Sequence, residues 1–157
     1  MSIFKKLFGR SDNPDNSSEN KKIDLEKLLS SGDINDSIIE LDNYIGELCS
    51  YGDEMDKLTE QQKQFYYNQC LEREINNGGF NQYFFNSSGD YAHKTIQSLL
   101  TIGANKTADI LQKAIDQFPK RNVPEDRTER QKILEQIQVT ANLFWEELDQ
   151  KFFTYDA

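Results

Sequence analysis

Apolar residues recur every three or four positions along most of this chain, and this spacing limits what it can fold into. From residue 127 onward they step by 3, 4, 3, 4 and 4 residues, at Leu134, Ile137, Ala141, Phe144, Leu148 and Phe152. Such a spacing places the residues on one face of an α-helix. Valine, which favours strands, occurs only twice in the 157 residues. We therefore expect an all-α fold.

Residues that begin and end helices divide this pattern into about six or seven helices of one compact domain. Asp36 and Asp90 are predicted to start helices, and Thr59 with Gln62 matches a capping box. Breaks are expected at residues 76–79 and 86–89, at Gly103 and at Pro119, and a last helical region begins near Arg127. The inward-facing residues expected on the earlier helices are Ile38, Leu41, Ile45, Leu48, Ala92, Ile96, Leu99 and Leu100.

Residues 1–22 differ in composition from the rest of the chain. Every residue of 11–22 is polar or proline, which predicts a flexible linker. The ten residues before it combine Ile3, Phe4, Leu7 and Phe8 with three bases. They are either a basic amphipathic anchor for a membrane surface or partner, or a frayed end or segment resting on the domain. We expect the second, with a helical domain over residues 23–157.

Composition excludes several classes of protein. Two cysteines are too few for a disulfide scaffold, and one histidine leaves no zinc site of the usual Cys/His type. No apolar run reaches the roughly 18 residues of a membrane span, and Lys5 and Lys6 interrupt the apolar stretch that a signal peptide needs. No catalytic triad, phosphate-binding glycine loop or metal-ligand spacing is present. We therefore expect a cytoplasmic protein without catalytic residues, metal, cofactor or stable membrane insertion.

The acidic residues are concentrated in one segment. The formal net charge is −9, and residues 24–60 account for all of it with eleven acids and two bases. A chain of this charge repels nucleic acid and attracts basic partners. The residues expected to bind a basic protein are Asp33, Asp36, Glu40, Asp42, Glu47, Asp53, Glu54 and Asp56.

Three of these acids share one face of the helix expected from residue 36. Asp36, Glu40 and Glu47 lie opposite the apolar stripe, and carboxylates four residues apart rise about 6 Å along the axis. One DNA strand rises about 3.4 Å per phosphate, so the stripe could imitate roughly every second phosphate. Acidic helix faces also serve as solvated surface, and both interpretations remain open.

The most unusual segment is EINNGGFNQYFFNSSG, residues 74–89. Two glycines permit a tight reversal, and we expect Gly78 or Gly79 to have a positive φ or to touch another backbone. Glu74 is expected to face the interior. The segment is either a ligand pocket with Glu74 as general base, or an architectural element in which Glu74 accepts backbone N–H groups and the aromatic residues belong to the core. We expect the second.

The run Glu-x-x-Asn-Gly-Gly-Phe-x-Gln-Tyr-Phe-x-Asn resembles the hallmark of a bacterial family of small all-helical proteins typified by an acidic DNA mimic. Its positions here are Glu74, Asn77, Gly78, Gly79, Phe80, Gln82, Tyr83, Phe84 and Asn86. The similarity continues through Gly103, Ala104, Ala108, Phe118, Pro119, Arg127, Arg130, Leu148, Asp149 and Phe152 or Phe153, over most of residues 35–153. The resemblance implies a homodimer whose acidic surface imitates double-stranded DNA and occupies a DNA-binding transcription factor.

These observations favour a non-enzymatic, acidic, helical binding protein that occupies a basic protein such as a DNA-binding regulator. One alternative is a small-ligand binder or enzyme that uses the Glu74–Asn86 region. Another is a neutralising partner of one basic protein, as in an antitoxin or immunity protein. The first and last need a continuous acidic face, whereas the second needs an open cavity at Glu74, Asn81, Gln82 or Tyr83.

Overall fold

The computed structural model describes residues 23–30 and 32–155, so the expected tail and linker, residues 1–22, lie outside the described residues. Every regular element in this part of the chain is helical and no strand occurs in it, which confirms the all-α fold class. The chain divides into two compact units between Tyr66 and Tyr67, and each is described separately. A single domain over residues 23–157 stays a prediction. None of the helices in the described ranges is long and apolar enough to cross a bilayer.

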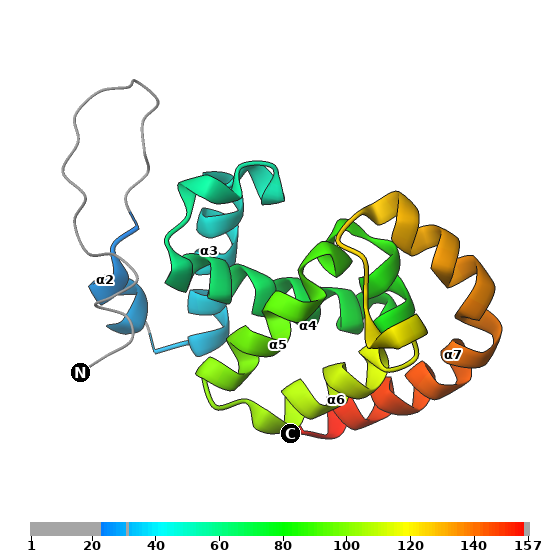
Figure 1. Cartoon of the computed structure of the whole chain (residues 1–157). Coiled ribbons are helices and arrows are strands. Elements are labelled where there is room, and N and C mark those ends of the chain that lie inside the picture. Colours follow the sequence, from blue (N-terminus) through cyan, green and yellow to red (C-terminus); the bar gives the residue numbers. More distant parts are fainter. Residues whose placement is uncertain (1–22, 31, 156–157) are drawn as a thin grey trace. The chain divides into compact units, whose positions relative to one another are not determined.

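The first unit carries the acidic segment. Its elements are α2 (Leu25–Ser30), α3 (Ile34–Leu48), η1 (Ser50–Gly52), η2 (Met55–Lys57) and the start of α4 (Glu60–Phe85), in the order shown in Figure 1. The predicted capping box begins α4: the Thr59 N–H donates to Gln62 Oε1 at 2.9 Å and the Gln62 N–H donates to Thr59 Oγ1 at 3.3 Å. Both bonds satisfy donors that a helix start leaves without partners.

The start of α3 differs from the prediction. Asp33, and not Asp36, caps the helix, because its carboxylate accepts the N–H groups of Asn35 and Asp36. Asp36 therefore lies in the first turn with its side chain exposed, where the N-terminal end of the helix dipole stabilises an acid. Leu41 and Ile45 are buried as expected, whereas Ile38 is exposed.

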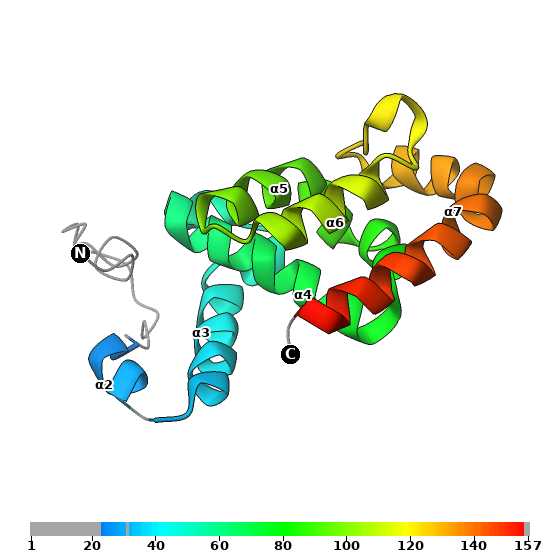
Figure 2. The same cartoon turned by 90° about the horizontal axis from the view of Figure 1, so that it is seen from below.

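The second unit holds the larger described core. After the kinked remainder of α4 come η3 (Ser87–Tyr91), α5 (Ala92–Thr101), α6 (Asn105–Ile115), η4 (Pro119–Arg121) and α7 (Arg127–Tyr155). The helix α6 contacts both α5 and α7, and Figure 2 shows α5 and α6 side by side. The expected break at residues 76–79 is a kink inside α4, where Gly78 and Gly79 leave helical angles. Asp90 lies within η3 and does not start α5, which begins at Ala92.

Aromatic rings form the centre of this core. The Phe84 ring lies 4.9 Å from that of Phe118 and 5.1 Å from that of Trp145, measured between centroids. The prediction that Phe144 faces inward is wrong: it is 37% exposed and its neighbour Trp145 is 1% exposed. Trp145 takes the inner position because its indole N–H also donates to the Ala114 carbonyl, at 3.0 Å. Leu100, also expected inside, is exposed.

Candidate functional site: the acidic groove

Two helices of the first unit enclose a groove. The buried Ser37 hydroxyl of α3 lies 2.8 Å from the Leu28 carbonyl of α2 and donates to it, so α2 is held against α3. Ahead of α2, the Asp24 carboxylate accepts the Lys27 N–H at 3.1 Å. Asp24 binds a donor at the start of α2, and Ser37 binds a carbonyl in its last turn, so both side chains compensate for backbone partners that helix ends lack.

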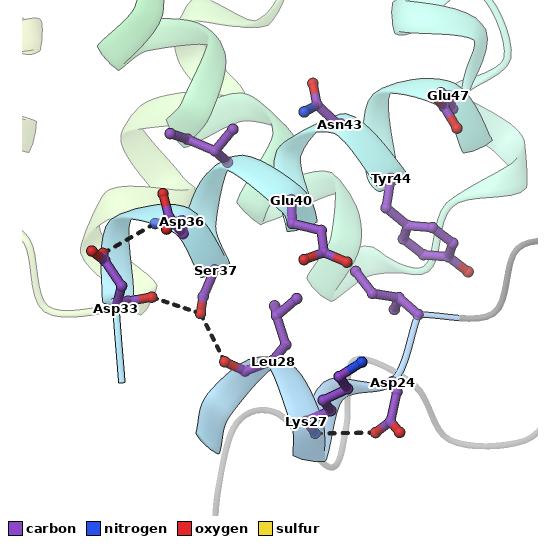
Figure 3. Close-up of a pocket in the computed structure, with 12 residues that line it drawn as sticks. Asp24, Lys27, Leu28, Asp33, Asp36, Ser37, Glu40, Asn43, Tyr44 and Glu47 are labelled. Carbon is purple, nitrogen blue, oxygen red and sulfur yellow. Dashed lines mark hydrogen bonds between the residues drawn. The ribbon is translucent and has the colours of Figure 1, made fainter. Parts of the chain in front are cut away.

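The groove has a volume of about 830 Å³ and opens along α3. We call it the acidic groove. Its lining residues are Ile23, Asp24, Lys27, Leu28, Asp33, Asp36, Ser37, Ile39, Glu40, Asn43, Tyr44 and Glu47. In Figure 3, Glu40 and Tyr44 extend from α3 toward the segment that carries Asp24 and Lys27.

Negative charge dominates this lining. Five of the residues are acids, and Lys27 is the one base among them. Within the described part of the chain, Asp36, Glu40 and Glu47 have no ion-pair partner, and all three are exposed. They follow one face of α3 for eleven residues, about 17 Å along its axis. The groove therefore exposes a row of three carboxylates along α3.

The eight predicted partner-binding acids are not all in this groove. Asp33, Asp36, Glu40 and Glu47 line it, but Asp42 does not. Asp42 is six residues from Asp36, which places it on a different face of α3. The remaining three follow α3: Glu54 forms an ion pair with Lys57 at 2.6 Å, and Asp53 and Asp56 are exposed around the two 3-10 turns.

Sequence reasoning did not find the rest of the groove. Asp24 and Lys27 are part of it because α2 packs on α3, and no local signal in the sequence predicts that pairing. Ile39 and Tyr44 lie on the acidic side of α3, off the predicted apolar stripe. Apolar residues on a polar helix face were the available signal.

The second unit holds the Glu74–Asn86 motif, and its polar groups are occupied. The Glu74 carboxylate accepts hydrogen bonds from Gln82 Nε2 at 2.7 Å, Asn86 Nδ2 at 2.9 Å and Ser88 Oγ at 3.0 Å. The donors are side chains, and the expectation that Glu74 binds backbone N–H groups is wrong. The glycine kink brings two amides close enough to occupy the carboxylate instead.

The backbone donor at the kink is bound by another acid. Gly79 has a φ of +73°, and an added Cβ would lie 2.1 Å from Asp149 Oδ2, which confirms the prediction for the glycine pair. The next residue, Phe80, donates its N–H to Asp149 Oδ1 at 3.0 Å. Burial raises the pKa of Asp149 to about 6. The nearby Glu146 raises this pKa slightly, whereas the hydrogen bond from the Phe80 N–H lowers it.

Arg130 holds the end of the motif and the residues after it by hydrogen bonds. Its guanidinium is completely buried, and its Nε donates to the Phe84 carbonyl at 2.6 Å. Nη1 donates to the carbonyls of Pro124 and Glu125, and Nη2 donates to the Asn86 carbonyl and to the Asp90 carboxylate. All five N–H donors of the side chain therefore have acceptors. The Asp90 carboxylate, which was expected at a helix start, binds Arg130 instead.

The rest of the motif is also built into the fold. Phe80, Tyr83 and Phe84 are fully buried, and the Tyr83 hydroxyl donates to Thr95 Oγ1 at 3.1 Å. Asn81 donates to Asn142 Oδ1 at 3.1 Å. None of the motif residues lines the acidic groove, which is confined to residues 23–47.

Comparison with known proteins adds one match. The family model described as DMP19-like protein matches residues 56–157. The chain matches no curated protein and no solved structure. The matched residues include the motif, Arg130 and Asp149. They begin after α3, so the acidic groove lies outside them.

Proposed function

Since the chain belongs to the DMP19-like protein family, we propose that it is a non-enzymatic binding protein whose acidic groove occupies a basic protein, such as a DNA-binding regulator. The observation that supports this most directly is the row formed by Asp36, Glu40 and Glu47, which have no ion-pair partner among the described residues. Carboxylates kept without partners on one surface raise the local potential and steer a basic protein toward it.

The spacing of this row supports imitation of DNA. Asp36 and Glu40 lie about 6 Å apart along the axis of α3, and Glu40 and Glu47 about 10.5 Å apart, close to two and three times the 3.4 Å rise per phosphate of one strand. Arginine and lysine side chains that reach for phosphates could then meet carboxylates at nearly matching intervals. A protein that binds DNA non-specifically relies on such contacts for most of its affinity.

The contacts in the second unit favour this proposal over a ligand site at the motif. A general base needs a carboxylate that a substrate can reach, whereas Glu74 already accepts three hydrogen bonds. The Tyr83 hydroxyl is buried and bonded to Thr95 Oγ1, and burial raises its pKa further above the range of a base that works near neutral pH. We assign the motif to the architecture of the second unit and the groove to binding.

The test is retention of DNA-binding proteins by the immobilised chain. Proteins eluted from DNA-cellulose are passed over wild type and over Glu40→Lys/Glu47→Lys. The matched control is Glu135→Lys/Glu147→Lys, which changes the net charge equally at two exposed residues of α7. We expect wild type and control to retain a basic protein and the groove variant to lose it. Retention should fall as salt rises, because the Debye length shrinks from about 10 Å at 0.1 M to about 3 Å at 1 M.

Duplex DNA added as competitor distinguishes imitation of DNA from neutralisation of another basic surface. Elution of the retained protein by DNA supports imitation. Retention that depends on Glu40 and Glu47 but resists DNA supports the antitoxin or immunity alternative. Equal retention by all three chains would contradict a role for the groove. The homodimer that the family resemblance implies stays a prediction, which light scattering measures.

A further inference from the structure

The acidic groove contains apolar surface as well as charge. Ile39 is 59% exposed, and Ile23 and Tyr44 are only partly buried. Imitation of phosphates would need carboxylates alone, whereas an occupant that also buries these apolar side chains gains free energy from the area removed from water. The lining therefore suits an occupant that is both basic and apolar.

The chain itself carries such a segment. Residues 1–10 contain three bases, no acid and the apolar residues Ile3, Phe4, Leu7 and Phe8. The acidic groove has five acids and one base, so the two charges are opposite in sign. Twelve residues, 11–22, each polar or proline, join this segment to Ile23, which already lines the groove.

The lengths allow the two to meet. A linker of twelve residues reaches at most about 40 Å, and a flexible one has a mean span of about 20 Å. Residues 3–10 cover about 12 Å as a helix or about 27 Å when extended, and the carboxylate row on α3 is about 17 Å long. A tether of this kind gives an effective concentration of the order of millimolar, so a weak contact suffices for occupancy.

We propose that residues 3–10 dock in the acidic groove of the same chain, with their lysines on the carboxylates of α3 and their apolar side chains on Ile39 and Tyr44. The docked segment covers Glu40 and Glu47, so a basic partner must displace it before binding. Docking is independent of any partner, whereas this regulatory consequence rests on the proposed function.

Paramagnetic relaxation tests the docking. A nitroxide is attached to Ser2→Cys in the full chain, where the two native thiols, Cys49 and Cys70, are buried. We expect strong broadening of the amide signals of Asp36, Glu40 and Tyr44. Lys5→Glu/Lys6→Glu should remove most of it, whereas Lys21→Glu/Lys22→Glu, with the same charge change in the linker, should leave most of it. Broadening that is equal in all three chains would overturn the proposal.

A charge swap makes the test specific for the groove. Glu40→Lys/Glu47→Lys alone should remove the broadening, as Lys5→Glu/Lys6→Glu does. The chain that carries all four substitutions should recover it, because lysines of α3 then face glutamates of the segment. Failure of the fourfold variant to recover any broadening would show that residues 3–10 do not meet Glu40 and Glu47.

Two more measurements separate the remaining occupants. Mixing ¹⁵N-labelled chain without nitroxide and unlabelled chain with nitroxide should give no broadening; broadening there would assign the groove to a second copy and overturn docking within one chain.

A synthetic peptide of residues 1–10 should bind Lys5→Glu/Lys6→Glu more tightly than wild type, because the wild-type groove is occupied. Equal affinity, or binding to neither, contradicts the proposal. If docking fails while Glu40→Lys/Glu47→Lys still abolishes retention of DNA-binding proteins, the proposed function stands without it.

Discussion

Replacing Gly79 with alanine measures how far the kink in α4 depends on close approach to α7. Gly79 has φ +73° and ψ −170°, a conformation that residues with a Cβ adopt only under strain. The added methyl carbon would lie 2.1 Å from Asp149 Oδ2 and 2.8 Å from Asp149 Cγ. Since no Cβ tolerates such distances, Asp149 must move away.

The expected loss of stability has two parts. Backbone strain costs about 1–3 kcal/mol. Displacement of Asp149 leaves the Phe80 N–H without its acceptor, which costs a further 1–3 kcal/mol or so for a buried donor. We expect a total loss of about 2–6 kcal/mol, a large fraction of the roughly 5–15 kcal/mol that stabilises an ordinary domain.

Urea unfolding followed by the fluorescence of the buried Trp145 gives the free energy. Gly103→Ala is the matched control, because Gly103 has φ +83° and no atom within 4 Å of an added Cβ. It should lose only the backbone part, about 1–2 kcal/mol. Equal losses for the two variants would refute the role of Asp149. As a second check, Gly79→Ala should lower the free energy of unfolding by less when Asp149→Ala is already present, because no carboxylate then meets the added Cβ.

Three further changes probe the same unit by urea unfolding. Arg130→Lys keeps the charge but loses the five-donor fork, so we expect a loss of about 3–5 kcal/mol, and an unchanged midpoint would contradict a structural role. Glu74→Gln exchanges charge-assisted for neutral hydrogen bonds and should cost about 1–2 kcal/mol; a loss as large as that of Arg130→Lys would show that more than these bonds is involved. The pKa of Asp149 rises on folding from 3.8 to about 6, so the folded state binds the proton more tightly and its stability falls as pH rises from 4 to 6. Asp149→Asn removes this loss and should exceed wild type by about 1–2 kcal/mol above pH 6, after allowance for solvent screening, whereas a difference that is constant from pH 4 to 8 would rule the shift out.

Local patterns predicted the parts of the fold that local chemistry determines. The capping box at Thr59 and Gln62 forms as expected, and the glycine pair bends α4 where the sequence places it. The capping box depends on residues three positions apart and the bend on two adjacent glycines, so both are visible in the local sequence. The choice between Phe144 and Trp145 was missed because the partners of Trp145 come from α4 and α6.

Contacts between distant residues explain the rest. Arg130 bonds to carbonyls up to 46 positions away, and neither its burial nor its acceptors can be read from nearby residues. For the acidic groove, helical periodicity did place Asp36, Glu40 and Glu47 together, and the same periodicity separates Asp42 from them. The pairing of α2 with α3, which adds Asp24 and apolar surface, needed the structure.

The hydrogen bond between Phe80 and Asp149 also has a consequence for folding during synthesis on the ribosome. A ribosome adds about 5–20 residues per second, and the two residues are 69 positions apart, so Phe80 is synthesised roughly 3–14 s before Asp149. During that interval the aromatic rings after the kink have no α7 to cover them. Nascent chains of this protein should therefore be substrates for the chaperones that hold exposed apolar segments until synthesis is complete.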